Sequence, residues 1–75
     1  MKFHICLRPE PEGGYTVMVP ALPGCITWGN NLDHARAMAK EAIELYIESL
    51  VEEGERLPDD SQNLLETIEV EVPIG

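Results

Sequence analysis

Three short segments in the first third of the chain, at residues 2–8, 15–19 and 25–28, are predicted to be strands, and apolar and polar residues alternate along the first of them. In the first segment, Phe3, Ile5 and Leu7 fall on the same side of an extended chain. A period of two is typical of a β-strand with one buried face. Prolines and glycines separate the three segments at residues 9–14 and 20–24, where they remove donors and permit turns. We therefore predict an antiparallel meander of three strands.

The middle of the chain changes to a helical period. Asn31 is a good N-cap, and Asp33 places an anion in the first turn, where the helix dipole favours it. Gly54 and Pro58 together form a helix stop signal. The apolar residues between these ends share one stripe: Leu32, Ala35, Ala39, Ala42, Ile43, Tyr46 and Leu50. We predict a helix from about residue 32 to about residue 53 that buries this stripe against the sheet.

Alternation returns after the loop at residues 58–61. Residues 64–72 place Leu64, Ile68, Val70 and Val72 on one face and Thr67, Glu69 and Glu71 on the other. This pattern predicts a fourth strand. The helix would then form a right-handed crossover that returns the strand to the sheet. The predicted fold class is α+β, with the element order β-β-β-α-β.

The length and composition indicate one small globular domain. The chain has 75 residues, of which 44% are hydrophobic, so we expect a single domain at residues 1–75. A domain of this size gains little from its core, and no disulfide framework or metal motif adds to it. We therefore expect a homo-oligomer, a dimer or larger. Cys6 and Cys25 are expected to be free thiols in a reducing compartment.

The charge is strongly negative. Fourteen Asp and Glu residues against five Lys and Arg give a formal net charge of −9. Such a charge repels phosphate backbones and anionic lipid surfaces, so we expect neither direct nucleic-acid binding nor membrane association. The N-terminus has no apolar stretch of signal-peptide length, which predicts a cytoplasmic protein.

Five glutamates step along the predicted helix by three or four residues, on the side away from the apolar stripe: Glu41, Glu44, Glu48, Glu52 and Glu55. Residues at this spacing are neighbours on a helix surface, so the five carboxylates form one row. A solvated face that keeps the protein soluble is one interpretation. A docking surface for a basic partner is the other, and composition leaves both open.

Candidate catalytic groups are few. A two-metal nuclease needs several converging carboxylates, whereas the first strand carries His4, Cys6 and Arg8. Glu69 and Glu71 share a strand face, but the sequence specifies no third ligand beside them. The histidines and cysteines show no close-spaced ligand pair. We therefore predict no enzyme activity, no cofactor and no metal site.

Three groups of residues resemble a known family. The first is Gly13-Gly14-Tyr15-Thr16-Val17, and the second runs from Val19-Pro20-Ala21 through Leu22-Pro23-Gly24-Cys25. The third comprises Gly29 before the helix and, within and after it, Glu41-Ala42, Glu53-Gly54 and Pro58. In this order these residues are similar to those of the HicB-like antitoxins, and the resemblance covers about residues 1–58.

The resemblance implies a domain similar to a truncated ribonuclease H fold without its catalytic acids. It also implies that the chain neutralises a small basic HicA-type toxin, an mRNA-cleaving ribonuclease, by covering its active site. Many family members continue into a DNA-binding domain, and we expect none here because no basic segment follows. The residues expected to contact the toxin are Glu10, Glu12, Tyr15, Trp28, Glu41, Glu44 and Glu48.

Two alternatives stay open at this stage. One is an orphan domain that serves as an oligomeric scaffold or sensor. The other is a degenerate metal-dependent nuclease that uses Glu69, Glu71 and a helix acid.

Overall fold

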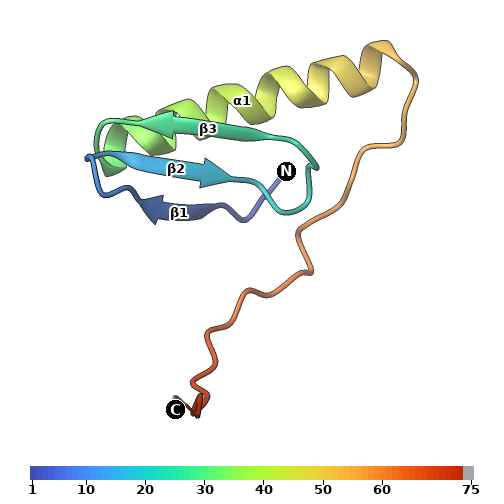
Figure 1. Ribbon diagram of the computed structural model, residues 1–75. Helices are drawn as coiled ribbons and strands as arrows, with labels where there is room; N and C mark the ends of the chain where they lie inside the picture. Colours follow the sequence, from blue (N-terminus) through green and yellow to red (C-terminus); the bar gives the residue numbers. More distant parts are fainter. Residues whose placement is uncertain (74–75) are drawn as a thin grey trace.

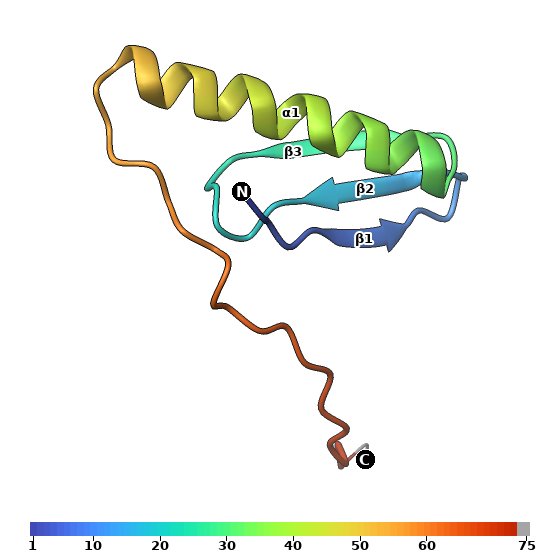
Figure 2. The ribbon, with the colours of Figure 1, turned by 180° about the vertical axis from the view of Figure 1, so that it is seen from behind.

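The computed structural model describes residues 1–73, which form three short strands and one long helix. The elements are β1 (Cys6–Pro9), β2 (Tyr15–Met18), β3 (Ile26–Gly29) and α1 (Leu32–Glu52). The strands pair antiparallel in the order β1-β2-β3, as the predicted meander requires. α1 covers one face of this sheet, and no other element of residues 1–73 covers the opposite face (Figures 1 and 2). The α+β class is confirmed.

The first strand is shorter than predicted, since it begins at Cys6 rather than at Lys2. Cys6 pairs with Met18, and continuing the same register would place His4 opposite Pro20. A proline has no N–H to donate to a ladder, and the chain turns at that point. Residues 2–5 are therefore left without a partner strand on the β2 side.

The helix ends match the sequence signals closely. The Asn31 side chain accepts a hydrogen bond from the His34 N–H at 2.8 Å, which makes Asn31 the N-cap. At the other end Gly54 has φ +71°, and its N–H donates to the Val51 carbonyl at 3.1 Å. The Glu55 N–H donates to the Leu50 carbonyl at 2.9 Å. This pair of bonds is a Schellman motif, so the predicted stop at Gly54 is confirmed.

The core lies between α1 and the sheet face that carries the odd-numbered residues of β2. One buried cluster joins Val17 to Ala35 and Ala39. A second cluster lies under the C-terminal half of α1, which extends past the strands, and its buried members are Val19, Leu22 and Cys25. Ala42, Ile43, Tyr46 and Ile47 of α1 pack against it. Most of the predicted apolar stripe therefore packs on the core, whereas Leu32 at its start is exposed.

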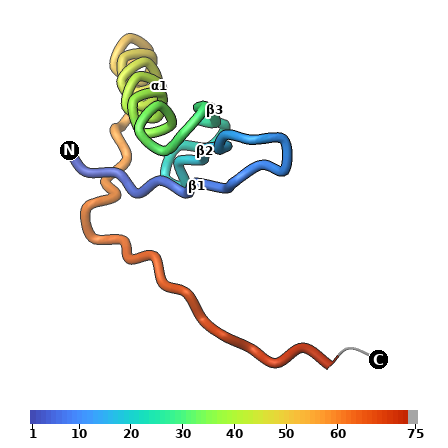
Figure 3. The backbone as a smooth tube through the Cα atoms, turned by 90° about the vertical axis from the view of Figure 1, so that its left-hand side faces the viewer, coloured from blue at the N-terminus to red at the C-terminus, as the bar shows by residue number. Residues whose placement is uncertain are grey.

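The predicted fourth strand is not confirmed. Within the described chain, residues 64–73 pair with no strand, and this segment runs away from the domain (Figures 1 and 3). Leu64 is 81% exposed and Ile68 is 77% exposed. Alternation alone produces an extended segment with one apolar face, whereas a strand also needs a neighbour that pairs with its backbone groups. The likeness to a ribonuclease H fold stays a prediction.

Candidate functional site

The uncovered face of the sheet presents the even-numbered strand residues. Arg8, Thr16 and Trp28 lie opposite one another in one row, and Cys6, Met18 and Ile26 form the next row. Trp28 is 45% exposed and Ile26 is 62% exposed. A Cβ added at Gly14 would lie 2.3 Å from the Cζ2 atom of Trp28, so the indole ring rests directly on this glycine. This face therefore offers an exposed aromatic ring beside aliphatic side chains.

Glu10 closes the hairpin between β1 and β2. Its Oε1 atom accepts hydrogen bonds from Thr16 Oγ1 at 2.8 Å and from Arg8 Nε at 2.9 Å. The Thr16 bond, followed by the Arg8 bond, lowers the pKa of the Glu10 carboxyl below its ordinary value. Both strong donors near Glu10 belong to its own hairpin, so this carboxylate already has partners within the chain.

The other residues predicted near this turn are separated by the sheet. Glu12 is exposed at the turn itself. Tyr15 lies on the opposite face from Trp28, because it packs against the cluster of Val17, Ala35 and Ala39. The structure therefore does not bring the predicted aromatics together. Tyr15 contributes to the core, whereas Trp28 is available on the surface.

The predicted glutamates of α1 are all exposed, at Glu41, Glu44 and Glu48. The ion pairs formed among residues 1–73 join His4 to Asp60, Arg8 to Glu10, and Arg36 to Asp33. None of them includes a glutamate of the helix. The last turn of α1 also contains no basic residue. Within the described chain, α1 thus presents an exposed row of carboxylates that form no ion pair, which we call the glutamate ridge (Glu41, Glu44 and Glu48).

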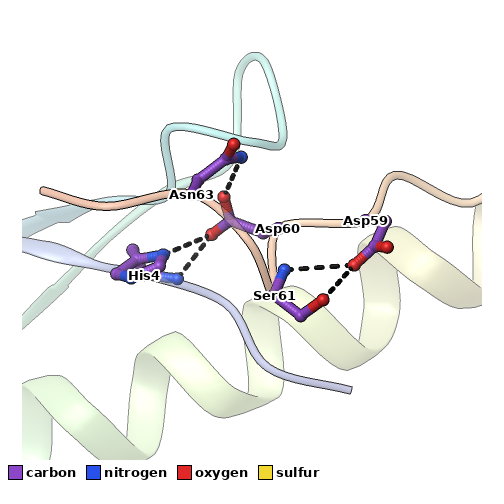
Figure 4. Close-up of polar contacts among 5 residues, drawn as sticks. All are labelled: His4, Asp59, Asp60, Ser61 and Asn63. Atoms are coloured by element: carbon purple, nitrogen blue, oxygen red, sulfur yellow. Dashed lines mark hydrogen bonds and ion pairs between the residues drawn. The ribbon is translucent and has the colours of Figure 1, made fainter.

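A long-range contact that the sequence does not reveal ties the C-terminal segment to the N-terminus (Figure 4). Asp60 is buried, and its Oδ2 atom accepts from the His4 backbone N–H at 2.7 Å and lies 3.0 Å from His4 Nδ1. Its Oδ1 atom accepts from Asn63 Nδ2 at 2.6 Å. The His4 backbone bond, with further bonds from Asn63 and the His4 ring, lowers the pKa of Asp60 to about 2.

Several observations bear on catalysis. Within residues 1–73, no group of three or more His, Cys, Asp and Glu side chains is placed to hold a metal ion. Glu69 and Glu71 belong to the C-terminal segment, which runs away from α1 in Figure 1, so the nuclease alternative has no assembled acid site in the described chain. Cys25 is buried, and burial raises the pKa of its thiol, which disfavours the nucleophilic thiolate.

The helix of residues 32–52 is not apolar enough to cross a membrane.

A three-stranded antiparallel sheet with one covering helix and an acidic helix surface defines a small α+β domain. Residues 3–71 match the family described as HicB-like antitoxin of a bacterial toxin–antitoxin system. The chain belongs to this family, as the motifs at the two turns and the helix predict.

Relatives from several organisms agree with this assignment. A UPF0150 protein of Thermoplasma acidophilum is 44% identical over 61 residues, which cover 81% of this chain and 88% of that protein. A UPF0150 protein of Archaeoglobus fulgidus is 49% identical over 57 residues, covering 73% of this chain and 83% of the relative. Antitoxin HicB of Escherichia coli is 31% identical over 75 residues, which cover all of this chain and 54% of that antitoxin. Membership of this family and the similarity to antitoxin HicB support a role in a toxin–antitoxin pair and a non-catalytic one.

Proposed function

We propose that this chain neutralises a small basic HicA-type toxin by binding over the surface that the toxin uses to cleave mRNA. Membership of the antitoxin family supports a toxin partner. The observation that carries the choice of surface is the glutamate ridge, which is exposed and whose carboxylates form no ion pair in the described chain. A ribonuclease that binds RNA needs a positively charged surface, and this ridge has the complementary charge.

The glutamate ridge destabilises the isolated helix. Like charges three or four residues apart destabilise a helix by about 0.2–0.5 kcal/mol per pair. Acids toward the C-terminus also oppose the helix dipole. A cationic surface that docks on Glu41, Glu44 and Glu48 would relieve both effects on binding. The folded chain therefore has a higher affinity for a basic surface than its net charge of −9 alone would give.

The proposed contact is centred on α1 rather than on the hairpin. Trp28 lies on the sheet face opposite α1, so a single flat surface cannot contact both Trp28 and the ridge. Glu10 is held by Arg8 and Thr16. We therefore assign toxin binding to Glu41, Glu44 and Glu48.

The experiment is a neutralisation assay. A HicA-type toxin is purified, and its cleavage of a model mRNA is followed while the full chain is titrated in. Cleavage should fall to background at a stoichiometric ratio, because occlusion removes the active site from the RNA. Polyglutamate at equal total charge is the control and should inhibit only weakly at that ratio. Undiminished cleavage in excess chain, or equal inhibition by polyglutamate, would contradict the proposal.

A further inference from the structure

The departing C-terminal segment carries a row of side chains that the described chain leaves exposed. Leu64, Ile68, Val70 and Val72 alternate along it and share one face of an extended segment, together with Glu66. We call residues 64–72 the tail. Aliphatic side chains at this density on an extended segment are typical of a strand whose one face is buried in a core. The tail therefore needs an apolar surface to cover it.

A groove that is apolar, like the exposed face of the tail, lies between the N-terminal residues and α1. Its volume is about 660 Å³. The apolar side chains that line it are Met1, Phe3, Ile5, Ile43 and Ile47. Charged side chains of α1 lie along its length, with Arg36 and Lys40 in the N-terminal half of the helix and Glu44 and Glu48 further on. The groove thus combines an aliphatic floor with a cationic end, which favours an acidic residue of a strand, and an anionic end.

The same groove adjoins an open sheet edge. β1 is an edge strand, because the sheet order is β1-β2-β3. The Glu10 N–H donates to the Gly14 carbonyl in the β1–β2 hairpin, so even-numbered backbone groups of this segment point toward β2. By the alternation of an antiparallel ladder, the backbone groups of Ile5 and Leu7 point outward. A strand that paired there would place alternate side chains in the groove.

The tail of the same chain does not reach this edge. The contact between Asp60 and His4 fixes the start of the tail at the N-terminal segment. Beyond Asn63 the tail continues away from both the sheet and α1 (Figures 1 and 3). The groove and the apolar face of the tail are therefore both exposed within one chain. Each is an apolar surface of the kind that would bury the other.

We propose that two copies of this chain exchange their tails, so that residues 64–72 of each pair with the outer edge of β1 in the other. Ile68, Val70 and Val72 enter the partner's groove, and Glu66 approaches the cationic half of the helix. The exchange is reciprocal and closes with two-fold symmetry. Glu44 and Glu48 line the groove and also belong to the glutamate ridge, so the exchanged tail lies beside the toxin contact. The exchange is argued from the groove and the tail alone and does not depend on the proposed function.

Disulfide trapping tests the exchange directly in the absence of toxin. Cys6 is exposed on the sheet face away from α1, where the tail residues of the polar face should lie beside it. One tagged chain carries C6S and C25S with a cysteine placed in turn by T67C, E69C or E71C. A second chain with a different tag keeps Cys6 and carries only C25S. Mild oxidation of the mixture should give a disulfide between the two tags for at least one tail position.

A chain that combines Cys6 with the same tail cysteine distinguishes exchange from self-docking. Exchange predicts a disulfide-linked dimer on a non-reducing gel. A disulfide within one chain would overturn the proposal in favour of self-docking. Absence of any cross-link at all three tail positions would overturn it as well.

Light scattering provides an independent test with a matched pair of variants. Ile68→Asp places a charge on the apolar face of the tail, and Thr67→Asp places the same charge on the polar face. The unmodified chain and Thr67→Asp should have the mass of a dimer, whereas Ile68→Asp should have the mass of a monomer with unchanged helical circular dichroism. A monomeric unmodified chain, or a dimeric Ile68→Asp variant, would overturn the proposal. A tail that becomes buried only when the toxin is added would assign the groove to the toxin instead.

Discussion

Gly29 ends β3 and lies close against the backbone of α1. A Cβ added there would lie 2.3 Å from the Ala35 backbone nitrogen and 2.4 Å from the Ala35 Cα atom. Both atoms belong to the helix backbone, so neither can move aside without shifting α1. The glycine found before the helix in the sequence thus has a packing reason, which the structure alone supplies.

Gly29→Ala should therefore destabilise the fold by about 2 kcal/mol or more, because the start of α1 must move away from the sheet. The free energy of unfolding from urea denaturation is the measurement. Asn30→Ala is the control, since this exposed neighbour uses its backbone N–H rather than its side chain in the hydrogen bond to His34. A Gly29→Ala variant within about 0.5 kcal/mol of the unmodified chain would show that the close approach is not required.

The Asp60 contact with His4 predicts a response to acid. The pKa of Asp60 in the folded chain is about 2, below its ordinary value of 3.8. A depressed pKa means that the contact stabilises the folded chain above the ordinary value and is lost as the pH falls from about 4 toward 2. The amide resonance of His4 in an NMR titration should therefore shift with a midpoint near 2.

The control for this titration is Asp60→Asn, which removes the ionisable group while keeping an amide oxygen that can accept a hydrogen bond. Its His4 amide should show no transition in the same range. A midpoint near 3.8 in the unmodified chain would mean that Asp60 is not held by His4 in solution.

At the scale of elements, α1 follows most directly from local chemistry. The Asn31 cap, the apolar stripe and the Gly54 stop all predict the observed helix, because each acts within one or two turns of its own position. The strands are predicted in number, but their lengths are not. Whether His4 joins β1 depends on Pro20, sixteen residues away along the chain, so the pairing register decides the boundary.

Asn31→Ala should cost about 1 kcal/mol of stability, because the His34 N–H loses its side-chain acceptor. The loss is read from the midpoint of urea denaturation, with Asn30→Ala again as the control. Equal stability of the two variants would mean that water replaces the cap without cost.

The tail shows where sequence periodicity stops being informative. Its alternation correctly indicates an extended segment with one apolar face, but the partner that covers this face is not encoded locally. The candidate site is likewise predicted only in part from the sequence. The helical period places Glu41, Glu44 and Glu48 on the surface correctly, whereas the opposite orientations of Tyr15 and Trp28 follow only from strand pairing.

At the scale of the whole molecule, the net charge of −9 is not spread evenly, because basic and acidic side chains occupy different parts of α1. The basic side chains Arg36 and Lys40 line the groove in the first half of α1, and the glutamate ridge follows them along the helix. Repulsion of RNA is a property of the total charge. Recognition of a toxin requires negative charge to be concentrated on one surface, the glutamate ridge. This is the central claim of the proposed function.

The affinity of the toxin for two charge-reversed variants, measured by isothermal titration calorimetry, tests this claim most directly. E41K/E44K/E48K reverses the ridge, and E12K/E53K/E69K makes the same change in net charge at exposed positions outside the row of helix glutamates. Light scattering first verifies that both variants keep the assembly state of the unmodified chain. We predict that the ridge variant binds about 100-fold more weakly or worse, and that the control loses less than about tenfold. Equal losses in the two variants, or unchanged binding by the ridge variant, would contradict the account.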